Sequence, residues 1–135
     1  NTLVGFQAGL SLDGETDNTV LGYNALGGSS AVDSTVVIGY NAGDAAMTAA
    51  GDGNVLIGHS AGSAMTSAAG AVAVGYQALV ASVTGLGNTA IGYEAMATDT
   101  GYGDECTAVG YRALKAHAAD TDAHGQNTAV GHSAR

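Results

Sequence analysis

The sequence predicts an all-β repeat solenoid, a parallel β-roll of about eight coils. Three observations predict this fold. Near-copies of one octapeptide, typified by NTAIGYEA at residues 88–95, recur eight times along the 135 residues. The residues just before the glycine of each copy are β-branched or aliphatic, which favours a strand. The segments between copies are rich in Ala, Gly, Ser, Thr and Asp, which is typical of loops.

The glycine of the motif sets the period of the array. The steps between successive glycines are 17, 17, 19, 17, 17, 18 and 21 residues, and the eight glycines are Gly5, Gly22, Gly39, Gly58, Gly75, Gly92, Gly110 and Gly131. A short and nearly fixed period indicates units that stack on their neighbours. We therefore interpret residues 1–135 as a single repeat array. Because both ends lie within a copy of the motif, we expect a segment of a longer fibre protein.

The residues before the glycine predict a short strand in each copy. The residue next to the glycine is always Val, Leu or Ile, and two positions earlier it is Thr or Val, so these two side chains share one face. The residue between them is Leu, Val or Ala. A strand that is apolar on both faces is usually buried on both, as in parallel sheets. We therefore expect something to cover the second face.

The glycine itself has two possible explanations. It adopts a backbone angle closed to other residues, or it makes a contact too close for a Cβ atom. Either one predicts a bend or a tight crossing in every coil. The residue after it carries a ring in all copies, and we expect these rings to stack as a ladder that serves packing rather than ligand binding: Phe6, Tyr23, Tyr40, His59, Tyr76, Tyr93, Tyr111 and His132.

Alanine occupies the third position after the glycine in every copy, at Ala8, Ala25, Ala42, Ala61, Ala78, Ala95, Ala113 and Ala134. An unvarying small side chain indicates a packed position where a larger one would clash. In the variable segments that follow, AAMTAAG and ALKAHAAD could form one helical turn each. They are too short for stable helices, and no leucine-rich consensus supports a strand-plus-helix solenoid.

Composition excludes several classes of function. With 3 basic and 12 acidic residues the formal net charge is -9, which argues against nucleic acid or an anionic membrane as a partner. The hydrophobic fraction of 46% is too high for a disordered Gly-rich linker. The single cysteine, Cys106, allows no disulfide within the chain and stands where five other copies have Asn, so we interpret it as a tolerated small side chain.

One coil buries too little to be stable alone. Ordering costs roughly 1.5 kcal/mol per residue, and most side chains of a coil are Ala, Thr, Ser or Gly. Hydrogen bonds between stacked coils recover part of this cost. Apolar contact with other chains would recover more, so we expect parallel stacking together with oligomerisation.

Few residues are candidates for metal binding or catalysis. In KAHAADTDAHGQ, the weak metal candidates Asp120, Asp122 and His124 loosely resemble the start of a calcium loop, and His117 with His124 could suggest a transition metal, but a solvated loop is the simpler interpretation. The acidic residues lie in variable segments rather than at one repeated position, and no catalytic motif is present. We therefore predict no enzyme activity and no cofactor. An ice-binding array is disfavoured, since it would want a regular array of Thr, commonly two per coil, whereas this motif has one Thr position and three copies replace it with Val.

The motif N-T-x-[VIL]-G-[YFH]-x-A resembles the head repeat of trimeric autotransporter adhesins, the YadA-like head, and similar repeats in the shafts of phage tail fibres. The resemblance implies a left-handed parallel β-roll and a homotrimer of chains around one axis, with strand residues facing the roll interior and the trimer axis. It places Gly92 and Gly110 at the turn glycine, and it assigns the core aliphatic position to residues such as Val4, Ile91, Val109 and Val130. The period of 17 to 21 residues and the Tyr-x-Ala-Leu after the glycine favour the phage-fibre version.

The function implied is that of a structural and adhesive fibre segment, first of all part of a phage tail fibre that contacts the host surface. The alternatives are the head of a bacterial trimeric autotransporter adhesin and a fibre-borne polysaccharide hydrolase. The expected partners are two further copies of the chain and, through the variable loops, a host cell-surface glycan or protein. We expect no nucleic-acid partner and no membrane insertion by this segment, and a location on a virion or a bacterial cell surface.

Overall fold

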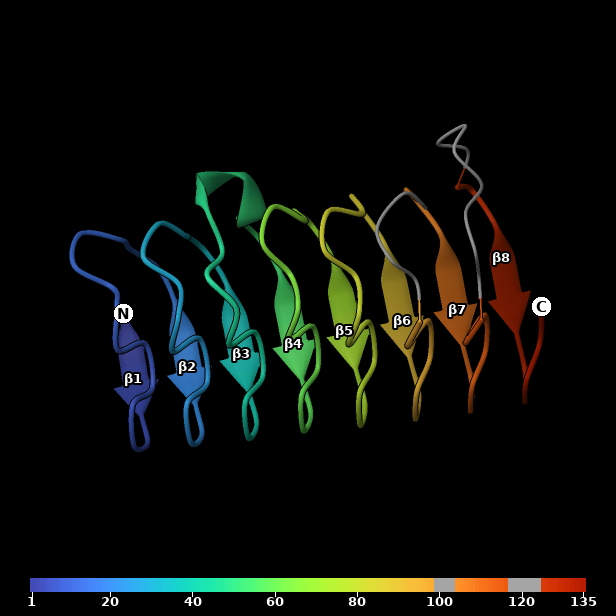
Figure 1. Cartoon of the computed structure of the whole chain (residues 1–135), viewed down its shortest axis with the longest axis horizontal. Helices are drawn as coiled ribbons and strands as arrows, with labels where there is room; N and C mark the ends of the chain where they lie inside the picture. Colours follow the sequence, from blue (N-terminus) through green and yellow to red (C-terminus); the bar gives the residue numbers. More distant parts are fainter. Residues whose placement is uncertain (99–103, 117–124) are drawn as a thin grey trace.

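The computed structural model describes residues 1–98, 104–116 and 125–135. These residues form a β-solenoid in which every coil contributes one strand to a single parallel sheet, so the predicted all-β repeat fold is confirmed (Figure 1). The strands follow one another in sequence order as β1 (Thr2–Val4), β2 (Thr19–Leu21), β3 (Val36–Ile38), β4 (Val55–Ile57), β5 (Val72–Val74), β6 (Thr89–Ile91), β7 (Thr107–Val109) and β8 (Thr128–Val130).

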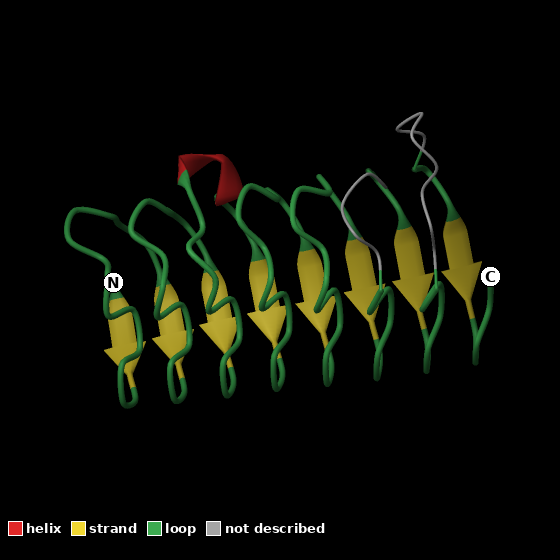
Figure 2. Ribbon diagram, in the orientation of Figure 1, coloured by secondary structure: helices red, strands yellow, loops and turns green. Residues whose placement is uncertain are grey.

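Strand pairing keeps the motif copies in register. Between β5 and β6, for example, Ala73 pairs with Ala90 and Val74 with Ile91. The differences in repeat length are therefore absorbed outside the strands (Figure 2). Between β3 and β4, where the step is 19 residues, the segment AAMTAAG contains the 3-10 helix η1 (Ala49–Gly51), which confirms the helical turn predicted there.

The core is a narrow column inside the coils. The middle residue of each strand from β2 onward is buried, and around it pack the alanines of the third position after the glycine and larger side chains such as Leu79 and Met96. The strand alternates its side chains between two faces, and the remainder of the coil covers only the face of the middle residue. A single chain thus buries one face of its sheet.

The prediction that both faces are buried is wrong for the single chain. The residue before the glycine points outward, with exposed fractions of 55% at Val4, 40% at Ile91 and 69% at Val130. Ile38, Ile57, Val74 and Val109 are half-buried at the same position. The core aliphatic position assigned by the resemblance is therefore outside the core of the coil itself, because a coil of 17 residues closes on one side of its strand only.

Both explanations for the motif glycine are confirmed: its backbone angle is unfavourable for other residues, and its contact with the next coil leaves no room for a Cβ atom. The φ angles of these glycines lie between 130° and 141°. A Cβ atom on any of the first seven would stand 2.3 to 2.4 Å from the carbonyl oxygen of the equivalent glycine in the next coil. The glycines also join neighbouring coils, since the N–H of Gly75 donates to Ile57 at 2.8 Å and that of Gly92 to Val74 at 2.8 Å. The bend predicted at this position is thus also a tight crossing between coils.

Where the first position of the motif is Asn, its side chain ties that coil to the next. The side chain of Asn54 is fully buried, and its Nδ2 donates to the carbonyls of Gly51 and Ala68, both at 2.7 Å. Its Oδ1 accepts from the backbone N–H of Ala71, the equivalent residue of the following coil, at 2.7 Å. Asn18 accepts from Thr35 and Asn88 from Cys106 in the same way. One side chain thereby satisfies buried backbone groups of two coils.

Replacing Asn54 with Ala is expected to lower the free energy of unfolding by about 2 kcal/mol, because buried backbone groups lose their partner. Urea denaturation at a fixed chain concentration measures the change. The matched control is Asn127→Ala, at the same motif position but exposed, where water can substitute for the amide and a smaller loss is expected. Equal losses at the two positions would contradict the role of burial.

Candidate functional site

The outward face of the sheet carries a continuous row of aliphatic side chains, here called the aliphatic ladder: Val4, Leu21, Ile38, Ile57, Val74, Ile91, Val109 and Val130. Because the strands pair in register, each member stands directly above the next. The ladder extends roughly 34 Å, at about 4.8 Å per coil. Within each strand it is accompanied on this face by the Thr or Val two positions earlier.

Immediately beyond the bend that ends each strand lies the ring ladder, formed by the aromatic or imidazole residue after each motif glycine. Successive ring centroids are 4.9 to 5.3 Å apart, with interplanar angles of 10° to 29°. The predicted stacking is therefore confirmed. Each inner ring has both faces covered by its neighbours, so the ladder presents ring edges to the surroundings. A sugar ring stacks on an open aromatic face, which these inner rings lack.

Most of the large exposed apolar side chains in the described part of the chain belong to these two ladders. They include Val4 and Leu21 of the aliphatic ladder and Phe6, Tyr23 and Tyr40 of the ring ladder. Soluble monomers rarely expose a continuous apolar patch of more than a few hundred Å². The long apolar surface built by the repeat is therefore the candidate functional site of the chain.

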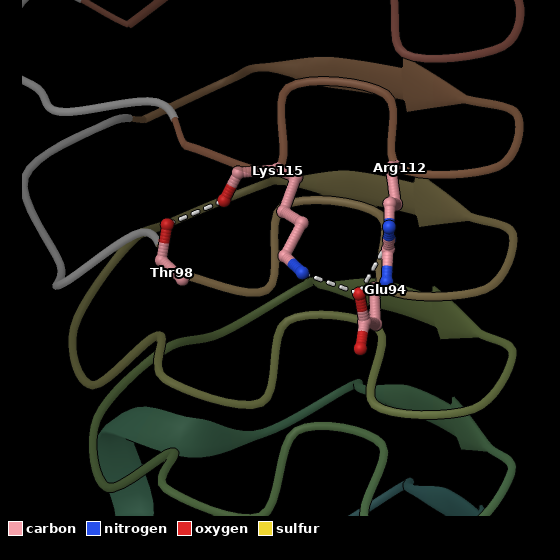
Figure 3. Close-up of polar contacts among 4 residues, drawn as sticks. All are labelled: Glu94, Thr98, Arg112 and Lys115. Atoms are coloured by element: carbon pink, nitrogen blue, oxygen red, sulfur yellow. Dashed lines mark hydrogen bonds and ion pairs between the residues drawn. The ribbon is translucent and has the colours of Figure 1, made fainter.

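A row of mostly polar positions follows the ring ladder, two residues after each glycine, and all its members have positive φ angles between 50° and 56°. It includes the carboxylate of Glu94, which accepts from Arg112 Nε at 2.8 Å and from Lys115 Nζ at 2.5 Å (Figure 3). The hydrogen bond from Lys115 is the main reason that the pKa of Glu94 is lowered, and the bond to Glu94 raises the pKa of Arg112. This cluster holds the ion pairs found within the described ranges.

The expectation that acidic residues share no repeated position is wrong for three of them. Asp33, Asp52 and Asp104 each lie six residues before a motif glycine. Their carboxylates accept from backbone N–H groups of the preceding coil, at 2.6 Å from Thr16, 2.9 Å from Asp33 and 2.7 Å from Leu86. Loops of variable length conceal this position in the sequence. Counting backward from the next glycine, rather than forward from the last, would have revealed it.

The metal candidates Asp120, Asp122 and His124, and also His117, lie outside the described residues. In the described part of the chain, no group of three or more His, Cys, Asp or Glu side chains is placed to hold a metal ion. Cys106 is buried with a free thiol. Among the described residues there is no helix of the length and apolar character needed to span a membrane.

The fold and the two ladders define the chain as a repeat β-solenoid with one uncovered apolar side. Comparison with protein-family models, with curated proteins and with solved structures finds no match. Any function must therefore be argued from the geometry of the chain itself.

Proposed function

We propose that the chain is a structural and adhesive fibre segment, in which three copies cover one another's aliphatic ladders around a common axis. The observation that carries the proposal is the uncovered outer face of the sheet, apolar at the same position in all eight coils. The occupant is a second copy because the surface has the period of this chain. A partner with the same coil spacing matches it along its whole length.

The absence of charged side chains from the outer sheet face supports a partner whose contact surface is also apolar. The residues that form the outer sheet face are Val, Ile, Leu and Thr, with no ionisable group among them. Acidic side chains such as Asp33, Asp52 and Asp104 lie at a different position of the coil, before the strand. There their carboxylates accept hydrogen bonds from backbone N–H groups. Parallel copies could thus bring their aliphatic ladders together without burying unpaired carboxylates, which would be costly.

The proposed setting is a phage tail fibre that contacts the host surface, because the long repeat and the Tyr-x-Ala-Leu sequence resemble that version of the motif. A head of a bacterial trimeric adhesin would use the same assembly. Flanking sequence separates the two: a membrane-anchor barrel indicates the adhesin, and a virion-attachment domain indicates the phage fibre. A hydrolase gains no support from Asp33, Asp52 and Asp104, whose carboxylates accept backbone hydrogen bonds.

The native mass of the chain in solution tests the assembly. Light scattering or native mass spectrometry is expected to give the mass of three chains. A mass of two chains would retain the apolar contact but reject the three-fold arrangement. A folded single chain at micromolar concentration would overturn the proposal.

Replacing Ile57 with Lys is expected to shift the native mass toward the single chain, because it places a charge in the middle of the aliphatic ladder, where its burial is costly. Circular dichroism should show that the coil itself remains folded, since Ile57 lies outside its core. The control is Ser30→Lys, which adds the same charge at an exposed loop residue and should leave the mass unchanged. An unchanged mass for Ile57→Lys would exclude this face as the contact.

A further inference from the structure

In the described part of the chain, the ring ladder places tyrosines directly against one another. Tyr23 stacks on Tyr40 with ring centroids 5.3 Å apart, and Tyr93 stacks on Tyr76 at 5.0 Å and on Tyr111 at 5.3 Å. The rings of these pairs are nearly parallel, at interplanar angles of 10° to 11°. The ring spacing is close to the distance of about 4.8 Å between coils, so equivalent atoms of adjacent phenols lie next to one another.

Of the side chains that oxidants attack most readily, tyrosine is the type that this fold leaves open. The sequence has no tryptophan, and its sulfur-bearing residues Cys106, Met47, Met65 and Met96 are all buried, with exposed fractions of 2% or less. The ladder tyrosines have exposed fractions of 40% to 49%. Because stacking covers the ring faces, the open part of each phenol is its edge. A one-electron oxidant in solvent therefore reaches the phenol edges before it reaches sulfur.

Oxidation of two adjacent phenols joins them by a carbon–carbon bond. Each phenol gives up one electron and one proton and becomes a phenoxyl radical, whose unpaired electron lies partly on the Cε atoms beside the oxygen. Two such radicals form one bond between their Cε atoms, and the hydrogen that each of these atoms carried then moves to the phenol oxygen. The pair has lost two hydrogen atoms, which one molecule of hydrogen peroxide takes up to give two molecules of water.

The ladder holds the reacting carbons together before the oxidant acts. Two rings joined by such a bond have their centres about as far apart as the stacked rings, so coupling requires the rings to tilt rather than the coils to move. Nearly half of each tyrosine is open to solvent, and the torsion that turns a tyrosine ring is broad, so this tilt is available. Groups held in contact within one molecule react far faster than separate molecules do. Coupling between neighbouring coils should therefore outcompete coupling between chains.

We propose that adjacent tyrosines of the ring ladder are a site of oxidative coupling, where a peroxide activated by a peroxidase joins neighbouring coils through a dityrosine bond. The preferred pair is Tyr23 with Tyr40, whose exposed fractions of 48% and 49% are the highest of the set. The Cζ of Arg112 lies 4.9 Å from the ring centroid of Tyr111 and 5.9 Å from that of Tyr93, and a positive charge there opposes the loss of an electron.

The bond would fasten one coil to the next in the way that a disulfide fastens a loop, by restricting the unfolded chain. A sequence with a single, buried cysteine cannot form an internal disulfide for this purpose. The site lies within one chain, on stacked coils, and does not rest on the proposed three-chain assembly. A native mass of one chain would thus overturn the assembly and leave this proposal standing.

Treatment of the folded chain with hydrogen peroxide and a haem peroxidase tests the site. We expect dityrosine fluorescence, a product that keeps the mass of one chain on a denaturing gel, and a linked pair of peptides containing Tyr23 and Tyr40 by mass spectrometry. The chain unfolded in urea should couple roughly tenfold more slowly or less, relative to free tyrosine in the same solution, because its phenols are no longer held together. Links between chains only, equal relative rates for the folded and unfolded chain, or no dityrosine while free tyrosine couples would each overturn the proposal.

Tyr40→Phe should abolish coupling at Tyr23, because the other ring stacked on Tyr23 belongs to Phe6, which is not a phenol. Adding Phe6→Tyr to this variant places a phenol on the opposite face of Tyr23, where the ring centroids are 5.3 Å apart, and should restore the coupling. Both changes keep the ring, so the variants should fold, and circular dichroism checks this. All chains carry Tyr102→Phe, because Tyr102 lies outside the described residues. Coupling at Tyr23 that persists in Tyr40→Phe, or that Phe6→Tyr fails to restore, would show that stacked neighbours are not the partners.

Discussion

Replacing Gly75 with Ala is expected to lower the free energy of unfolding by about 4 kcal/mol or more. Two costs add together. At φ 137° the new side chain occupies a backbone conformation that L residues rarely adopt. Its Cβ would also lie 2.4 Å from the carbonyl oxygen of Gly92 and 2.7 Å from the carbonyl carbon, which no side-chain rotation can relieve. The two neighbouring coils would therefore have to separate at this crossing.

Two control variants separate these costs. Gly70 also has a positive φ, 66°, but nothing lies within 4 Å of its Cβ position, so Gly70→Ala should cost about 1 kcal/mol from backbone strain alone. Gly14 has neither constraint, and Gly14→Ala should be close to neutral or slightly stabilising. Denaturant unfolding at one chain concentration provides the comparison. A loss at Gly75 no greater than that at Gly70 would show that the crossing is not tight.

The sequence was sufficient to predict what is strictly repeated. The position of the strands, their parallel stacking and the ring ladder all follow from residues that recur at fixed distances from Gly5, Gly22 and their equivalents. Periodicity supplies this information because identical units that stack must place identical residues side by side. It does not identify which face of the strand the coil itself encloses. The outward position of Val4 and Ile91 therefore became visible only in the structure.

Features that repeat in backbone geometry but not in residue type could not be predicted from the sequence. The residue five positions before each motif glycine after the first has a positive φ, yet it is Asp17, Ser34, Gly53, Gly70, Gly87, Glu105 or Gln126. Several residue types tolerate this left-handed conformation at a modest cost. The ion pairs of Glu94 were missed for a different reason. Glu94 comes from the repeat before that of Arg112 and Lys115, and only the stacking of coils brings the three residues together.

Two positions that fill the interior of each coil vary in size in opposite directions: the centre of the strand and the fourth residue after the glycine. This pattern indicates a nearly constant core volume from coil to coil. Where the strand centre is Leu3, Val37 or Leu56, the fourth position after the glycine is another Gly. Where the centre is Ala, that position is large, in the pairs Ala73 with Leu79, Ala90 with Met96 and Ala108 with Leu114. Val20 with Leu26 is an exception. A Cβ added at Gly62 would meet Leu56 Cδ2 at 2.9 Å, so the two positions share one space.

Exchanging the two sizes within one coil should therefore be better tolerated than either change alone. Leu79→Gly is expected to cost about 3 kcal/mol by opening a cavity in the core, a loss reduced somewhat because Leu79 has a positive φ of 53°. Ala73→Leu is expected to cost about 1 to 3 kcal/mol by overpacking. In the double variant the new leucine fills the space vacated by the old one, and the loss should fall short of the sum by at least about 1 kcal/mol.

The control pairs Leu79→Gly with Ala108→Leu, two coils away and about 10 Å distant along the axis. At that distance the two changes should be independent and their costs should add. Urea unfolding of the parent chain, the three single variants and the two double variants completes both cycles. Additive losses in the Ala73 and Leu79 cycle would mean that the two positions do not compete for the same volume. The pairing of a small strand centre with a large fourth residue after the glycine, and of a large centre with Gly, would then need a separate cause in each coil.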